Sequence, residues 1–257
     1  MALNDTKPVL MLLVPLLMLH RDFDTSFEFP NFSGPYANSL ITLQGDAFES
    51  NGVIKLTKLQ NDVITRNSAG RSTYGLPVRL WNAETGKVAR FNTTFSFEIL
   101  HGPVSTTGDG ISFFLAPFQS PMPPGSDGGY LGLFSPHTAL RNTDQNHIVA
   151  VEFDMHKNEW DPDEFPHIGI DVNSISSVTT VPWENDRFGL LTVFATVTYD
   201  PVSQILSVVV HEGPKISLMI DLRTVLPEWV RVGFSGSTGQ LDEVHEIQFW
   251  TFSSSFD

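Results

Sequence analysis

Hydrophobic and polar residues alternate along many short segments of the chain. In residues 91–99 the odd positions hold Phe, Thr, Phe, Phe and Ile, whereas the even positions hold Asn, Thr, Ser and Glu. A period of two residues is typical of a β-strand with one buried face. Similar segments lie at 26–29, 54–57, 110–116, 191–198, 205–210, 230–234 and 247–252. Glycine and proline separate them and no long helical pattern occurs, which predicts an all-β sandwich of antiparallel sheets.

The first 23 residues differ from the rest of the chain. They contain an apolar run after a single lysine, interrupted by Pro8 and Pro15. The run is shorter than the roughly 20 residues of a membrane-spanning helix and fits the apolar part of a signal peptide. We therefore expect residues 1–23 to be a signal peptide or a divergent leader. No break in composition divides residues 24–257, which we expect to form a single domain.

Composition excludes several classes of function. The chain has 41% hydrophobic residues, with 20 Phe and 5 Trp, which is enough for a substantial core. Its net charge of -14 argues against binding to nucleic acid or insertion at an anionic membrane, since both require a basic surface. The absence of cysteine excludes disulfides, zinc–thiolate sites and a thiol nucleophile.

Residues 147–177 place several side chains that can bind a metal ion close together in the sequence. The segment begins as a strand in which Glu152 and Asp154 occupy alternate positions. Two carboxylates with this spacing face the same side of a strand, roughly 7 Å apart, close enough to flank one ion. A polar turn follows, and a second apolar segment begins at His167. This hairpin therefore brings together carboxylates, an amide and an imidazole.

These ligand types suit two different cations. Calcium prefers carboxylate, amide and carbonyl oxygens, while manganese accepts carboxylates together with an imidazole. Asp154 and Asp161 lie between the two kinds of ligand and would bridge the ions. The alternative interpretation is that these residues are solvated turn acids and a surface histidine, the common state of such residues taken singly. Their density within sixteen residues, 152–167, favours a metal site.

The motifs V-E-F-D, N-x-W-D-P and H-I-G-I-D-V-N-S-I resemble the metal-binding core of the legume lectins. The resemblance extends from about residue 25 to residue 252 and implies a jelly-roll sandwich that binds carbohydrate. It implies two ligand sets: Glu152, Asp154, Asp161 and His167 for Mn²⁺, with Ser177 reaching the ion through water, and Asp154, the backbone carbonyl of His156, Asn158 and Asp161 for Ca²⁺.

The same resemblance implies a sugar site beside the metals. Asp109 would accept hydrogen bonds from sugar hydroxyls and follow a cis peptide bond, although T-G-D-G alone also fits an ordinary hairpin turn. The backbone N–H of Gly129 and the side chain of Asn158 would donate to the sugar. Two positions depart from the family pattern: Gly108 stands where alanine is usual, and His156 stands where an aromatic ring usually lies against the sugar.

The loop at 240–249 would close the sugar site. Its length resembles that of mannose- and glucose-binding members of the family, and Gln240 and Leu241 occupy the positions that contact the sugar. The sequence thus predicts a Ca²⁺- and Mn²⁺-dependent lectin of the mannose/glucose type. Its partners would be glycans or glycoproteins, and it would assemble as a homodimer or homotetramer.

Two alternatives remain at this point. A storage or defence protein would keep the fold but lack sugar binding. A glycoside hydrolase on a similar sandwich would need the pattern E-x-D-x-E, but here His156 replaces the second glutamate, so we expect no enzyme. Entry into the secretory pathway would lead to an extracellular or vacuolar storage compartment. There the sequons at Asn31 and Asn92 are candidates for glycosylation.

Overall fold

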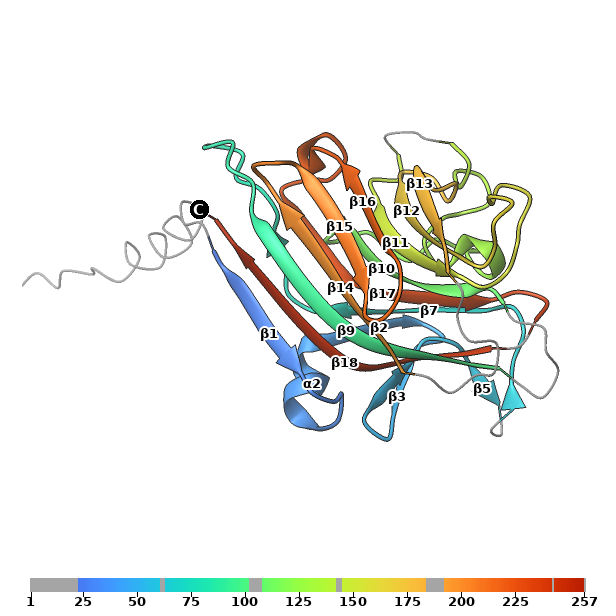
Figure 1. The fold of residues 1–257 in the computed structure, drawn as a ribbon. Coiled ribbons are helices and arrows are strands. Elements are labelled where there is room, and N and C mark those ends of the chain that lie inside the picture. The colour runs from blue at the N-terminus through green and yellow to red at the C-terminus, as the bar shows by residue number, and fades with distance from the viewer. Residues whose placement is uncertain are drawn as a thin grey trace, which may run out of the picture.

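A computed structural model describes residues 23–60, 63–101, 108–141, 145–183, 192–241 and 243–256. The leader predicted at residues 1–23 lies almost entirely outside this part of the chain. Within the described residues two antiparallel eight-stranded sheets pack face to face, with a small two-stranded sheet at the side (Figure 1). The predicted all-β sandwich is confirmed. In the described residues no helix is long and apolar enough to cross a membrane.

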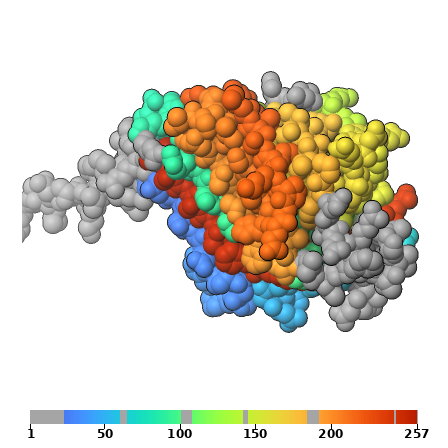
Figure 2. Space-filling view, viewed as in Figure 1, coloured from blue at the N-terminus to red at the C-terminus, as the bar shows by residue number. Residues whose placement is uncertain are grey.

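One sheet, called sheet A, contains the long strand over residues 91–99 whose alternation is the clearest in the sequence. Its order is β16 (Lys215–Met219), β15 (Ile205–Val210), β14 (Val193–Asp200), β9 (Arg90–His101), β18 (Glu243–Ser255), β4 (Val53–Lys55) and β3 (Phe48–Ser50), with β1 (Thr25–Phe29) also paired to β18. In the space-filling view, strands β14 to β16 form a continuous surface beside the loops that follow β11 and β12 (Figure 2).

The other sheet, called sheet B, carries the candidate site. Its order is β13 (Thr179–Pro182), β12 (His167–Val172), β11 (Val149–Asp154), β10 (Gly110–Pro117), β17 (Trp229–Thr238), β7 (Ser68–Tyr74) and β2 (Ile41–Gly45), with β8 (Val78–Arg79) also paired to β17. The remaining elements are the two-stranded sheet of β5 (Leu59–Gln60) and β6 (Val63–Ile64), the helix α2 (Gly34–Leu40), and the short helices η1 (Gly128–Tyr130) and η2 (Leu222–Thr224).

The main core lies between the sheets and is rich in aromatic side chains. On β9 the predicted alternation holds, because Phe91, Phe95 and Phe97 all point into the core and are buried. Phe95 packs edge-on against Phe234 with 4.9 Å between ring centroids. Edge-to-face aromatic pairs add to the free energy gained from apolar burial. The sequence pattern therefore places the inner face of sheet A correctly.

A second apolar cluster covers the outer face of sheet B. It contains Phe114, Leu131, Phe134 and Ile148, so the segment after η1 folds back over β10 and β11. Strand β11 is consequently buried on both faces along its whole length. Polar side chains on the covered face lie out of water, which gives the acids of β11 their unusual environment.

Candidate functional site

Strand register brings the predicted ligands to the same edge of sheet B. Gly110 on β10 pairs with Asp154 on β11, and Asp154 pairs with His167 on β12. Glu152 pairs with Gly169 on the same two strands. Because side chains alternate between faces, Glu152, Asp154 and His167 all point to the outer face of the sheet, away from the main core. The predicted hairpin is confirmed.

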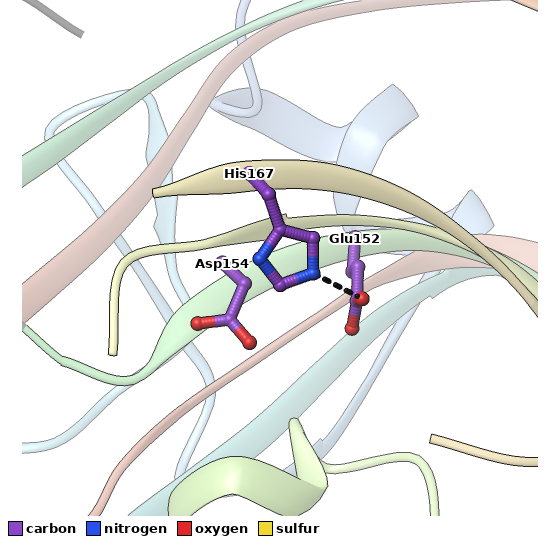
Figure 3. A group of neighbouring side chains, drawn as sticks. All are labelled: Glu152, Asp154 and His167. Carbon is purple, nitrogen blue, oxygen red and sulfur yellow. Dashed lines mark hydrogen bonds and ion pairs between the residues drawn. The ribbon is translucent and has the colours of Figure 1, made fainter. Parts of the chain in front are cut away.

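Glu152, Asp154 and His167 form a compact buried cluster (Figure 3). Their ligand atoms all lie within 4.8 Å of one another, and each side chain is at most 2% exposed. Nε2 of His167 lies 3.0 Å from Oε1 of Glu152. Carboxylates are almost never fully buried without a partner that compensates their charge. This arrangement has the chemical composition of a metal centre.

The pKa values of the buried acids are raised, the direction expected for carboxyls removed from water and close to one another. Burial, together with the charges of Glu152 and Asp161, raises the pKa of Asp154 well above its usual range. Burial also raises the pKa of Asp161, although a hydrogen bond from the backbone N–H of Asn158 works in the opposite direction. A bound cation would favour the charged forms and reverse these shifts.

Unpaired polar atoms give an independent test of the fit to a metal. Oε2 of Glu152, Oδ1 of Asn158 and Nδ1 of His167 are buried and have no hydrogen-bond partner in the described structure. Leaving such atoms unpaired is costly, and native structures rarely do so without a reason such as a bound ion. Glu152, Asp154, Asn158, Asp161 and His167 therefore fit a site for hard or borderline cations.

Ser177 and Asp171 complete the polar environment. The hydroxyl of Ser177 lies 2.7 Å from Oε1 of Glu152 and 2.6 Å from Oδ1 of Asp171. Asp171 is fully buried, and burial followed by the charge of Glu152 raises its pKa well above its usual range. A Cβ at Gly169 would collide with both Ser177 and Glu152, so glycine leaves the space that these groups use. Asp171 was not predicted from the sequence, although His167, Gly169 and Asp171 all lie on the same face of β12.

Asp109 lies beside this cluster, just before β10. The peptide bond between Gly108 and Asp109 is cis, as expected from the resemblance. The backbone of Asp109 donates to the carbonyl of Ser237 and accepts a hydrogen bond from Met155 N–H. Asp109 is 4% exposed, and burial raises the pKa of its carboxyl to about 6 despite the opposing charge of His156. The carboxyl of Asp109 is thus a buried hydrogen-bond acceptor beside the cluster of Glu152, Asp154 and His167.

Gly129 approaches Asn158 so closely that no side chain fits between them. A Cβ at Gly129 would overlap the amide of Asn158, with 2.7 Å to its Nδ2. The carbonyl of the preceding Gly128 accepts a hydrogen bond from Ser237 Oγ at 2.5 Å. These contacts, with the hydrogen bond from Asp109 N–H to Ser237, bring Gly129, Asn158 and Asp109 close together.

The loop that carries Gly129 is held by a buried arginine that sequence reasoning missed. Arg71 on β7 is 1% exposed and donates from Nε to the carbonyl of Gly132 at 2.7 Å and from Nη2 to that of Leu133 at 3.2 Å. Its guanidinium also lies over the ring of Phe114, 4.8 Å from the centroid. Burial and the charge of Arg231 lower the pKa of Arg71 to about 9. The role of Arg71 could have been found only from its place on the outer face of sheet B, where it pairs with Ser235.

The remaining two predicted sugar contacts follow β17 along the chain. Gly239 approaches the carboxyl of Asp109, since a Cβ there would lie 2.9 Å from Oδ2. Gln240 comes next and is exposed, and Leu241 after it is half-buried. Their neighbour at position 242 lies outside the described residues. The loop predicted at 240–249 is wrong in its extent, because residues 243–249 pair within sheet A as the start of β18.

The two-sheet fold and the acid–histidine cluster beside closely packed glycines define the class of lectin-type β-sandwiches. The comparisons agree, since the family model described as Legume lectin domain matches residues 24–257. The chain belongs to the legume lectin family. It is therefore a carbohydrate-binding protein and not an enzyme.

Relatives and solved structures support this assignment over most of the chain. Lectin 7 of Medicago truncatula is 49% identical over 276 residues and covers 100% of both chains. A mannose/glucose-specific lectin of Centrolobium tomentosum is 46% identical, with 89% of this chain and 95% of its own length covered. The structure of lectin II from Ulex europaeus is 40% identical, covers 91% of this chain and 100% of its own, and superimposes with a TM-score of 0.82.

Proposed function

We propose that this lectin binds mannose- or glucose-type sugars in a site that depends on Ca²⁺ and Mn²⁺. Glu152, Asp154, Asp161 and His167 would hold Mn²⁺, with Ser177 acting through water. Asp154, the His156 carbonyl, Asn158 and Asp161 would hold Ca²⁺. When bound, the cations supply positive charge that keeps the acids ionised and the surrounding loops fixed.

The observation that carries the metal proposal is the buried cluster of Glu152, Asp154 and His167, whose polar atoms are left unpaired. The sugar would lie against the side of the cluster formed by Asp109, Gly129 and Asn158. There the Asp109 carboxylate accepts hydrogen bonds, while the backbone N–H and the amide donate. A polyol needs such alternating partners, and glycine lets the backbone approach closely.

The choice of sugar concerns the segment that begins at Gln240 and Leu241, which is shorter than the predicted loop because β18 begins at Glu243. A relative described as mannose/glucose-specific supports the mannose/glucose type. A solved structure described as lectin UEA-II complexed with galactose, 39% identical to this chain, argues for the galactose type. A direct measurement therefore has to decide between them.

The test is a glycan array probed with the purified protein in Ca²⁺ and Mn²⁺, and again after treatment with EDTA. We expect binding to mannose- or glucose-terminated glycans only with the metals present. Asp109→Asn should abolish it, whereas Asp163→Asn, which changes an exposed acid of the same hairpin, should leave it intact. A folded protein that binds no glycan in either condition would instead indicate the storage or defence alternative.

A single shallow site is weak, because each sugar hydroxyl gives up water for a hydrogen bond worth about 0.5–1.5 kcal/mol. Useful avidity requires several linked sites, so we propose a homodimer or homotetramer. We also propose synthesis through the secretory pathway, with an extracellular or vacuolar destination. Asn31 is exposed in the described structure and precedes α2, which suits glycosylation. Light scattering and the mass before and after deglycosylation test these points.

A further inference from the structure

A row of small polar side chains crosses the outer face of sheet A, with Asn92 near its middle. On β9, Asn92 pairs with Ser253 of β18 on one side and with Thr198 of β14 on the other. The row continues to Ser26 on β1 and to Ser207 on β15. These strands lie side by side at the surface (Figure 2). Asn92 is exposed whereas its neighbours along β9 are buried, so the row faces away from the core.

The small size of these side chains leaves the face hollowed on both sides of Asn92. The larger hollow, of about 660 Å³, is lined by Asn92 together with Ser253, Thr198 and Ser207. A smaller one of about 240 Å³ lies between β1 and β18 and also includes Asn92. Further along β9 the face is closed, since Ser96 pairs with two phenylalanines and is only 2% exposed. Room for a large group therefore exists at Asn92 but not along the whole strand.

Asn92 also begins the tripeptide Asn92-Thr93-Thr94, which is the acceptor pattern for N-linked glycans. The hydroxyl of Thr93 points inward, where it donates to the carbonyl of Thr251 at 2.7 Å and accepts from Nε1 of Trp250 at 2.9 Å. The whole tripeptide lies within the paired strand β9. A glycan must therefore be attached before β9 pairs with its neighbours, and the folded sheet must then accommodate it.

We propose that Asn92 carries an N-linked glycan whose first sugars lie in the larger hollow, against the hydroxyls of Ser253, Thr198 and Ser207. This inference rests on the proposed synthesis through the secretory pathway. In the transfer, the amide nitrogen of Asn92 forms a bond to C1 of the first N-acetylglucosamine. The bond from C1 to the diphosphate of a lipid-linked oligosaccharide breaks, and one amide proton is released together with the lipid diphosphate.

The lining of the larger hollow suits a sugar. Serine and threonine hydroxyls both donate and accept hydrogen bonds, as sugar hydroxyls and an N-acetyl group require. The half-buried side chain of Ile205 adds an apolar contact for the C–H groups of a sugar ring. The charged residues of the lining include Arg90 and Asp200, which are about half exposed and remain hydrated. A glycan held there would be partly shielded from enzymes that act on it.

Occupancy is measured on the full chain expressed in plant cells. Treatment with a peptide:N-glycosidase in ¹⁸O-labelled water marks each glycosylated asparagine for mass spectrometry of the peptides. We expect the mark at residue 92 in wild type and its loss in Asn92→Gln. Thr94→Ser, which keeps the acceptor pattern, should retain it. Asn31→Gln, which removes the other sequon, is the matched control and should leave residue 92 glycosylated.

The place of the glycan is tested by its rate of removal from native protein. Release from Asn92 should be about tenfold slower than release from Asn31, since one or two net hydrogen bonds hold the glycan in the hollow. The difference should vanish after denaturation. Ser207→Trp should fill the hollow and speed release from Asn92. Ser217→Trp, at the exposed partner of Ser207 on β16, lies outside the lining and should not.

The outcomes separate the glycan from the secretory route on which it depends. An unmodified Asn92 in protein that is glycosylated at Asn31 would overturn the glycan and leave the route intact. Equal rates of release from the two native sites would overturn its place in the hollow. A chain that stays in the cytosol would overturn the route, and the full chain placed behind a host signal peptide would then still test Asn92.

Discussion

Nε2 of His167 lies 3.0 Å from Oε1 of Glu152, and both side chains are only 1% exposed. This contact lies within a group of buried acids. A cation shared by the two side chains would bind to these same two atoms. Removal of a bound ion is therefore expected to destabilise the cluster, because it leaves buried acids without the positive charge that offsets them.

Glu152→Gln should affect the metal-free and metal-bound proteins in opposite directions. The amide removes a buried negative charge close to Asp154 and Asp171, so the metal-free variant should unfold at a higher temperature than metal-free wild type. It should lose most of the stabilisation by Ca²⁺ and Mn²⁺, which reaches about 2.7 kcal/mol when the ion is at a hundredfold excess over its Kd. Calorimetric scans with and without EDTA measure both effects. Equal metal stabilisation in the variant and wild type would contradict the assigned ligand set.

Metal-free protein should become less stable as the pH rises through about 6. Burial raises the pKa of Asp109 from 3.8 to about 6, and the pKa values of Asp154, Asp161 and Asp171 also lie above their usual range. A carboxyl with a raised folded-state pKa contributes stability that is fully present below its unfolded pKa and is lost above the folded one. For Asp109 alone the loss is about 3 kcal/mol, at 1.36 kcal/mol per pKa unit.

This pH effect can be checked by denaturant unfolding of EDTA-treated protein between about pH 4 and pH 7. Asp109→Asn should flatten the curve over this interval. With saturating metal the dependence should reverse, because the ligands must be ionised to bind. A metal-free curve that rises with pH would show that other groups dominate.

Arg71→Met should weaken sugar binding without removing the metals. The substitution keeps apolar contact with Phe114 but leaves the carbonyls of Gly132 and Leu133 without their donor, at a cost of about 1–3 kcal/mol for each buried acceptor. The loop carrying Gly129 should then loosen. Titration calorimetry with sugar and, separately, with metal distinguishes the two sites.

Arg231→Met is the matched control for Arg71. Arg231 also donates to a backbone carbonyl, that of Phe118, but this lies beyond the end of β10 opposite Asp109. The control should lower the unfolding temperature while leaving sugar affinity near the wild-type value. If both variants lose sugar binding equally, Arg71 has only a general structural role.

Phe95→Ala should destabilise the sandwich by about 3–5 kcal/mol, the usual cost of removing a buried aromatic side chain. Phe95 lies between the sheets and contacts the rings of Phe113 and Phe234. Phe194→Ala, on the neighbouring strand but 43% exposed, should change stability by less than about 0.5 kcal/mol. Urea unfolding of both variants gives the comparison.

Local pattern was enough to predict the sandwich and the ligand-bearing hairpin. Period-two alternation on β9 depends only on which side chains are apolar, and the structure buries Phe91, Phe95 and Phe97 as expected. The same period placed Glu152 and Asp154 on one face. These predictions succeeded because strand geometry relates neighbouring residues directly.

Contacts between distant segments could not be obtained in this way. The guanidinium of Arg71 is buried against backbone carbonyls some sixty residues away, which accept its hydrogen bonds. The close approach of Gly108 to His156 depends on how two loops meet, which no periodicity records. Asp171 was overlooked because its burial comes from a covering segment and not from its own strand.

The register of β11 also has a consequence for folding. If β11 slipped by one residue against β10 and β12, Phe153 would exchange faces with Glu152 and Asp154, and the acids would enter the apolar core. A mispaired chain would then offer no complete set of ligands. Cation binding would therefore favour correctly folded molecules, since only those whose three strands have paired correctly gain the stability that the ion provides.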